Sequence, residues 1–457
     1  MRGDFAKHLT GFGMTQATLD RWMAERMGLT QPLTRAALDA WQLERLRETV
    51  AYARAASPFY RSRRDWPDIE IGALNDMARL PFTEQADLIR NDPPLLALSQ
   101  SAIARAVTLD TSGTSGPPKR LHFTAEDLEA TVDFFHHGMA MFTRPGDRAA
   151  IAFPAGRPGG ISEGLATALS RLAAEPLLAP RSAGPVELVA WLRAAKPDVI
   201  AGPPVPLLAA ARLAMSDGGA PLRVRAMLLS SDYVAVSLAR AITAACGAKI
   251  FEHWGMTETG YGGAVDCAYH AGCHLRENEL FAEVADPETG ELLPPGVLGE
   301  LVVSTLRRRS MPLLRYRTGD LVRLIEEPCP CGSVLRRLGS VLGRAGAGLT
   351  LPGAGELTLP ILDEALFAIQ GVTDFTATVQ KGEPATLRLS IATPAAMRTP
   401  AVLNAVRTSL FSAPAAGEGL RSGALRVEAA LADAIVFRHG AKRRLFIQES
   451  TPCAPCC

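Results

Sequence analysis

The chain lacks the features that mark membrane, secreted and nucleic-acid-binding proteins. No run approaches the roughly 18 apolar residues of a transmembrane helix, and the first residues hold no apolar core of a secretory signal. Charge of one sign is missing too, because 48 Lys and Arg balance 47 Asp and Glu. A binder of nucleic acid or of a membrane surface generally needs a positive excess to meet phosphate. We therefore expect a cytoplasmic protein with neither of these partners.

Cysteine is absent from the first half of the chain, and lysine is scarce throughout. All eight cysteines lie at or after Cys246, which excludes a disulfide framework for the chain as a whole. In a reducing compartment, clustered cysteines indicate metal binding or catalysis more often than disulfides. Only six of the 48 basic residues are lysines, so a lysine within a motif is slightly more informative than usual.

The chain does have the length and the apolar content for more than one folding unit. It has 457 residues, of which 47% are hydrophobic. Residues 1 to about 100 favour helices, with apolar residues at helical spacing over 33–54. From about 100 to 250, strand-like runs alternate with amphipathic segments, which is typical of a mostly parallel sheet covered by helices. Residues 279–325 predict a β-rich subdomain with hairpin turns, and the Gly-rich stretch 345–360 predicts a linker or hinge.

The most distinctive segment is TSGTSGPPK, which follows a predicted strand at 106–110. Its glycines allow tight turns that leave N–H groups free to point at an anion, and its hydroxyls and lysine add donors and charge. It is not a Walker A loop, because Lys119 comes three residues after Gly116 and the next residues, 120–123, predict a strand. Standing alone, it would also fit a flexible surface turn. The candidate phosphate-binding residues are Thr111, Ser112, Gly113, Thr114, Ser115, Gly116 and Lys119.

Two further motifs follow in order, His253–Glu258 (HWGMTE) and Arg315–Asp320 (RYRTGD). Together with the loop, they resemble the adenylate-forming superfamily of acyl- and aryl-CoA ligases. Within it, the chain is similar to the phenylacetate–CoA ligase-like branch, which includes coenzyme F390 synthetase-like proteins. The resemblance covers residues of about 100 to 345. It implies an α/β fold with a large domain over 1–343, built of mixed sheets, helical cover and a β-rich subdomain, and a small mobile α+β domain over 344–457.

This resemblance implies ATP-dependent activation of a carboxylic acid, aryl or related, to acyl-AMP with release of pyrophosphate, followed by transfer to CoA. ATP, Mg²⁺, CoA and a structural Zn²⁺ are the implied cofactors, and a small-molecule acid is the implied partner. Two alternatives stay open: transfer of the acyl group to a carrier protein or an amine, and a degenerate protein that binds a nucleotide without catalysis. A homodimer also stays open.

The motifs would divide the chemistry among them. The loop would hold the β- and γ-phosphates, Glu258 would bind Mg²⁺, and Thr257 would donate to the α-phosphate. Asp320 would accept from the ribose hydroxyls with Arg344 beside it. Taken singly, a Glu after Thr is more often a cap and an Asp after Gly a turn residue, so the order of the motifs carries the assignment. The remaining candidate nucleotide-binding residues are Ser231, Asp232, His253, Trp254, Gly255 and Met256.

The family resemblance also implies a catalytic lysine near the C-terminus, which would be Lys442 in GAKRR. An alanine separates this lysine from the glycine, so the context departs from the family pattern, and a solvated basic surface explains it equally well. The expected hinge after Arg344 carries no acidic residue, which leaves the thioester step less assured. The identity of the acid is open as well, since Phe134 and Phe135 fit either a pocket wall or a buried helix.

Cysteine and histidine gather in DCAYHAGCHL and CPCG. Thiolates plus imidazole suit tetrahedral Zn²⁺. The resemblance implies a structural site with four protein ligands, and unrelated buried cysteines are the alternative. The implied ligands are Cys267, His274, Cys329 and Cys331, with His270 and Cys273 as alternates. No role is assigned to Cys453, Cys456 and Cys457.

Overall fold

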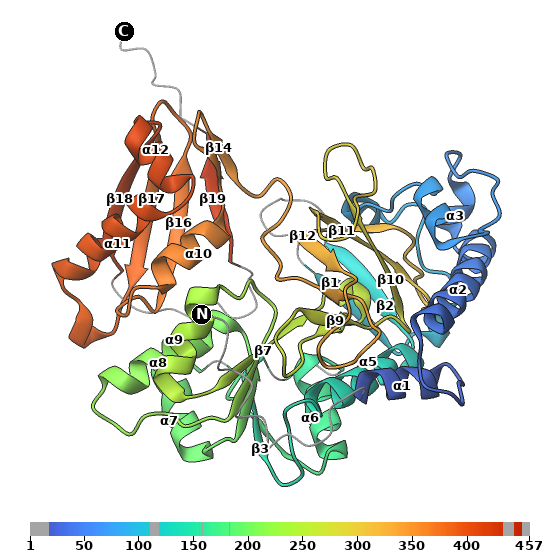
Figure 1. Ribbon diagram of the computed structural model, residues 1–457, viewed down its shortest axis with the longest axis horizontal. Helices are drawn as coiled ribbons and strands as arrows, with labels where there is room; N and C mark the ends of the chain where they lie inside the picture. The colour runs from blue at the N-terminus through green and yellow to red at the C-terminus, as the bar shows by residue number, and fades with distance from the viewer. Residues whose placement is uncertain are drawn as a thin grey trace.

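The computed structural model describes residues 18–109, 118–154, 156, 159–181, 183–432 and 443–449. Figure 1 shows a mixed α/β protein in which a second, smaller sheet with its own helices lies toward the C-terminus. This confirms the expected α/β class. None of the helices in the described part of the chain has both the length and the apolar character needed to cross a bilayer.

The N-terminal part is helical, as its spacing predicts. The helix expected over 33–54 is α2 (Arg35–Ala56), and the Thr34 hydroxyl caps it by accepting from the Ala37 amide at 3.2 Å. It ends at Ser57 because Pro58 follows and starts α3. The helices of this part are α1 (Thr18–Arg26), α2, α3 (Pro58–Ser62) and α4 (Gln85–Arg90).

The hydroxyl-rich segment joins two strands rather than a strand and a helix. β1 (Arg105–Leu109) pairs antiparallel with β2 (Lys119–Phe123), which confirms the argument against a Walker A loop. Helix α5 (Ala125–Met139) then begins with a capping box. The Thr124 hydroxyl accepts from the Asp127 amide at 3.1 Å, and the Asp127 carboxylate accepts from the Thr124 amide at 2.8 Å.

In the described part of the chain, the main sheet has eleven strands, and five of them run parallel as expected. In spatial order these are β4 (Glu175–Leu178), β3 (Arg148–Ile151), β5 (Val199–Gly202), β6 (Ala226–Leu229) and β7 (Lys249–Trp254). The connecting helices are α6 (Ile161–Arg171), α7 (Pro185–Ala195), α8 (Pro204–Ser216) and α9 (Val236–Cys246). Short apolar strands and longer amphipathic helices produce this alternation, because each helix covers a face of the sheet.

The other half of the sheet is antiparallel. It continues through β8 (Ala264–Val265), β9 (Cys273–Leu275), β13 (Arg337–Leu338), β12 (Tyr316–Ile325), β11 (Leu298–Thr305) and β10 (Leu280–Ala285). Strand β7 is parallel to β6 on one side and antiparallel to β8 on the other. The direction of the sheet therefore changes at β7, whose carboxyl end carries His253 and Trp254. In open α/β sheets, ligands bind outside the carboxyl ends of the parallel strands, and this is the end of β7 that carries these two residues.

The C-terminal unit is a four-stranded sheet in the order β18 (Leu425–Leu431), β17 (Ala385–Ala392), β16 (Asp374–Gln380) and β19 (Leu445–Gln448). Its helices are α10 (Leu359–Phe367), α11 (Pro400–Ser412) and α12 (Ala416–Ser422). The expectation of a linker over 345–360 is partly wrong. β14 (Leu349–Leu351) and β15 (Gly355–Leu357) form a hairpin with Leu351 and Leu357 buried. Gly353 and Gly355 have positive φ, so these glycines serve the turn.

Helix α10 docks this unit onto α9 (Figure 1). The Glu364 carboxylate accepts from the amides of Val236 and Ser237, at 2.7 and 3.0 Å, and from the Tyr233 hydroxyl at 2.9 Å. Amides in the first turn of a helix have no partner within the helix. Glu364, which is more than 120 residues away in sequence, therefore caps α9. At the last residue of α10, Phe367, the buried Arg212 donates to the carbonyl at 2.6 Å.

Candidate functional site

The loop-side lysine and the acidic residue of the second motif meet at an ion pair. Lys119 is the first residue of β2, and Glu258 lies in the 3₁₀ turn Thr257–Thr259 just beyond β7. The Lys119 ammonium contacts Glu258 Oε1 although 139 residues separate them. Glu258 is 2% exposed, so its carboxylate needs such a partner. Lys119, expected to bind phosphate, and Glu258, expected to bind Mg²⁺, are therefore in direct contact.

Tyr316 and Arg308 also hydrogen-bond to Glu258. The Tyr316 hydroxyl donates to Glu258 Oε1 at 3.3 Å. Burial, reinforced by the charge of Glu258, raises the pKa of Tyr316 above its ordinary value, so it remains a donor at neutral pH. The Arg308 guanidinium donates to the Glu258 carbonyl and, at 3.1 Å, to that of His122, which ties the turn to β2. Sequence reasoning quoted Tyr316 without giving it a role and missed Arg308, because one arginine among 42 carries no signal.

The third motif meets the end of β7. Trp254 Nε1 donates to Asp320 Oδ2 at 3.0 Å, and Arg344 Nε lies 3.6 Å from Asp320 Oδ1. Arg344 also donates to the Thr318 carbonyl at 2.6 Å. Gly319 has φ +80°, and a Cβ there would lie 2.9 Å from Arg344 Nη2, so glycine is required both for the turn and for the approach of the guanidinium. The residues expected at the ribose therefore lie together.

His253 faces the opposite side of β7 from Trp254, as alternation along a strand dictates. Its Nδ1 lies 2.8 Å from the Ser230 hydroxyl, and its ring centroid lies about 6 Å from those of Phe134 and Phe135 on α5. Burial lowers the pKa of His253 to about 4, so the ring is neutral at pH 7. His253 is thus a neutral polar group beside an aromatic wall.

The other candidates of this region lie on the loops at the carboxyl ends of β6 and β7. Ser231 has φ +79°, and the Asp232 carboxylate accepts from the Tyr233 amide at 2.9 Å. A Cβ on Gly255 would collide with the Tyr261 carbonyl, which explains the glycine of the second motif. Met256 directly precedes the turn that holds Glu258, and Thr257 is its first residue. The predicted residues Thr111–Gly116 and Lys442 lie outside the described residues.

The second candidate site is a cluster of four buried residues, Cys267, His274, Cys329 and Cys331. Their ligand atoms all lie within 4.8 Å of one another. Cys267 Sγ is 3.8 Å from Cys329 Sγ, and Cys331 Sγ is 3.4 Å from His274 Nε2. A tetrahedral zinc with Zn–S bonds of about 2.3 Å requires sulfurs about 3.8 Å apart, so the spacing fits this ion. Hydrogen bonds with Cys267 and then with His274 lower the pKa of Cys331, although burial acts in the opposite direction. The lowered pKa favours the thiolate form of Cys331.

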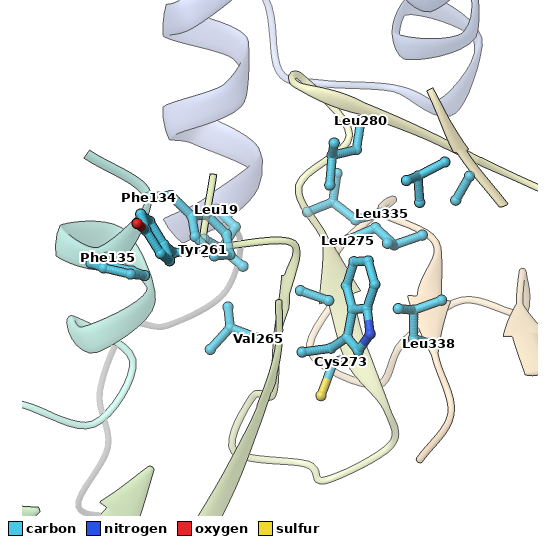
Figure 2. Close-up of a cluster of buried hydrophobic side chains, with 14 of the residues drawn as sticks. Leu19, Phe134, Phe135, Tyr261, Val265, Cys273, Leu275, Leu280, Leu335 and Leu338 are labelled. Atoms are coloured by element: carbon cyan, nitrogen blue, oxygen red, sulfur yellow. The ribbon is translucent and has the colours of Figure 1, made fainter. Parts of the chain in front are cut away.

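The two alternates have other partners. His270 Nδ1 pairs with Asp266 Oδ2 at 2.6 Å, and Cys273 Sγ lies 3.5 Å from the Glu252 carbonyl. Figure 2 shows Cys273 within the apolar cluster beside Leu275 and Leu338. Among the described residues, no second group of three or more Cys, His, Asp or Glu side chains is placed to hold a metal. The structure therefore brings together the four residues that the resemblance implied, and the two alternates are not among the grouped residues.

Comparison with known proteins gives matches over a large part of the chain. The family described as AMP-binding enzyme matches residues 70–306, more than half of the 457 residues. The phenylacetate-coenzyme A ligase of Thermus thermophilus is 32% identical over 296 residues, which is 62% of this chain and 65% of that protein. The corresponding ligase of Pseudomonas putida is 31% identical over 321 residues, 68% of this chain and 71% of that protein. The chain thus spans about two thirds of the length of these curated relatives.

Solved structures share the fold. 2-Hydroxyisobutyryl-CoA ligase in the postadenylation state superimposes with a TM-score of 0.75 at 24% identity, covering 90% of this chain and 89% of that one. The same ligase in the thioesterification state gives a TM-score of 0.63 at 24% identity, covering 91% of each chain. With a family match over more than half of its length and relatives above 30% identity, the chain belongs to the AMP-binding enzyme family.

Proposed function

We propose that this protein uses ATP to convert a carboxylic acid to acyl-AMP and then transfers the acyl group to CoA. In the first step a carboxylate oxygen bonds to the α-phosphorus and pyrophosphate leaves; in the second the CoA thiol attacks the acyl carbon and AMP leaves. The observation that carries the proposal is the meeting of Lys119 with Glu258 and of Trp254 with Asp320, which joins three separate motifs around the end of β7. Phenylacetate-coenzyme A ligases among the relatives support an aryl or related acid as the substrate.

The chemistry explains why this site is built from charges and donors. Two anions must approach, so catalysis depends on positioning and on neutralising charge more than on a base. Lys119 and the loop Thr111–Gly116 would meet the β- and γ-phosphates, and Thr257 would donate to the α-phosphate. Glu258 would bind Mg²⁺, which supplies charge neutralisation and prefers oxygen ligands. Tyr316 keeps a donor on the Glu258 carboxylate and orients it.

The nucleoside would lie on the other side of the β7 end. Asp320, oriented by Trp254 and with Arg344 close to its other oxygen, would accept from the ribose hydroxyls. His253, Gly255 and Met256 would flank the adenine or the acyl group, with Ser231 and Asp232 on the neighbouring loop. Lys442 would approach the α-phosphate from the small domain over 344–457, opposite the large domain over 1–343.

We also propose that Cys267, His274, Cys329 and Cys331 bind a structural Zn²⁺. Four protein ligands fill a tetrahedral shell and leave no position for substrate, so this metal would pin the loops around β9 and β13 instead of reacting. The measurement is metal content of the purified protein. One zinc per chain, lost on Cys329→Ser, is the expected result.

ATP–pyrophosphate exchange over a panel of aryl and small organic acids tests the adenylation. Exchange with at least one acid is expected, and Glu258→Gln should abolish most of it. Mass spectrometry of the product then identifies the acceptor, since an acyl-CoA supports the ligase. Accumulated acyl-AMP without a CoA ester would instead point to a carrier protein or an amine, and ATP binding without any exchange would point to a nucleotide-binding protein.

A further inference from the structure

The turn that carries two of the metal-site cysteines is held by a residue from the first helix. Asp20 of α1 is 5% exposed. Its Oδ1 accepts from the Ser333 hydroxyl at 2.5 Å, and its Oδ2 accepts from the Val334 amide at 3.0 Å. Ser333 follows Cys331 by two residues and is itself buried. Both carboxylate oxygens are therefore committed to the chain segment that ends the Cys329–Cys331 turn, 313 residues away in sequence.

This arrangement has the form of an outer support for a metal site. Side chains that hydrogen-bond ligand-bearing segments fix the ligands in the geometry that the metal requires, and losing one typically costs about 10- to 100-fold in metal affinity. The Ser333 hydroxyl also accepts from the Leu335 amide at 3.2 Å, so the carboxylate orders the whole turn rather than one side chain. Within the described residues Asp20 makes no salt bridge. The hydrogen bonds from Ser333 and Val334 therefore compensate for the burial of its carboxylate.

The far side of α1 is bound to α5. Trp22 Nε1 donates to Asp133 Oδ2 at 2.8 Å, and the Trp22 ring stacks on His137 with centroids 5.0 Å apart. Figure 2 shows Leu19 of α1 close to Phe134 of α5 in one buried cluster. Helix α1 thus spans from the metal-site turn to the helix that follows β2 and carries the aromatic residues facing His253.

We propose that Asp20 is a positioning residue for the metal centre, and that bound zinc in turn holds α1 in place through the Cys329–Cys331 turn. The proposal rests on the zinc site proposed above. Asp20 touches no ligand atom; it acts by orienting the turn so that the Cys329 and Cys331 thiols face Cys267 and His274. Without zinc the turn loses its anchor, whereas the direct contacts of α1 with α5 remain.

Zinc release from the full-length protein tests this role. The rate and affinity are measured by transfer of zinc to the chromogenic chelator 4-(2-pyridylazo)resorcinol. Asp20→Asn keeps the shape of the side chain but turns one acceptor into a donor, and we expect zinc affinity about 10- to 100-fold lower than wild type. The matched control is Asp133→Asn, which makes the same change of charge at the other side of α1, beside Trp22, and leaves the turn untouched. The zinc affinity of this control should stay at least about tenfold higher than that of Asp20→Asn.

A second readout follows the helix itself. Hydrogen exchange of residues 18–26 should be slower with zinc than without it in the wild type, and this difference should shrink in Asp20→Asn. If Asp20→Asn does not fold, Ser333→Ala, which removes only the hydroxyl donor, replaces it with the same expectation. Unchanged zinc affinity in the variant overturns the role of Asp20 while leaving the zinc site standing. A wild-type protein that binds no zinc overturns both.

Discussion

The docking of α10 onto α9 offers a quantitative test through Glu364. Its two carboxylate oxygens accept from the Val236 and Ser237 amides, and one of them also accepts from the Tyr233 hydroxyl. In Glu364→Gln, one oxygen keeps its partners, but the amide NH₂ now faces an N–H donor of α9. A hydrogen bond to a charged group contributes about 1.5–3 kcal/mol, and the helix-terminus interaction adds about 0.3–1 kcal/mol.

These terms add up to a weakening of the docked arrangement in Glu364→Gln by about 2–4 kcal/mol, or roughly 30- to 900-fold in the docking equilibrium. The assay is hydrogen exchange of the first turn of α9, with urea unfolding as a second measure. The matched control is Glu418→Gln, which removes an exposed i,i+3 pair with Arg421 and should change stability by no more than about 0.5 kcal/mol. Equal exchange in the two variants would refute the reasoning, because it would mean that the Glu364 hydrogen bonds add nothing to docking.

Four further outcomes are expected. Glu258→Gln should lower the rate of ATP–pyrophosphate exchange by about 10²- to 10³-fold, and a rate within threefold of wild type would remove Glu258 from the metal role. Asp320→Asn should raise the KM for ATP by about 10-fold or more while changing the KM for the acid little; equal rises in both would argue against a ribose contact. Removing zinc with a chelator should lower the melting temperature of the wild type, and Cys331→Ser should already melt at that lower temperature. Acidification should cost stability through His253: its folded pKa of about 4 lies below its ordinary 6.5, so only the unfolded state takes up the proton as pH falls from 6.5 to 4. The loss in the free energy of unfolding is at most about 3 kcal/mol. Urea unfolding measured across this pH range should show the loss for the wild type and not for His253→Gln.

Local signals predicted the elements that position the sites. Helix α2 was expected over 33–54 and lies at Arg35–Ala56, because apolar spacing, the Thr34 cap and Pro58 all act within a few residues. The strand on each side of the hydroxyl-rich loop was also expected. The residues that cap the next helix, Thr124 and Asp127, come only after β2, so the helix does not begin directly after the loop. The prediction of a linker or hinge over 345–360 was partly wrong because glycine marks a hairpin turn as readily as a flexible segment. The buried leucines on each side decide between the two, and burial is a tertiary property.

The candidate site shows the same division. The sequence by itself determined the order of the motifs, the residue types that suit phosphate, Mg²⁺ and zinc, and the glycines at positions such as Gly255 and Gly319. Only the tertiary structure decided that Lys119 meets Glu258, and that the four implied zinc ligands lie within reach of one ion. It alone brought Asp20 to the Cys329–Cys331 turn. The reason is physical: caps, turns and periodicity depend on neighbours in the chain, whereas these contacts depend on the order and direction of strands far apart in it.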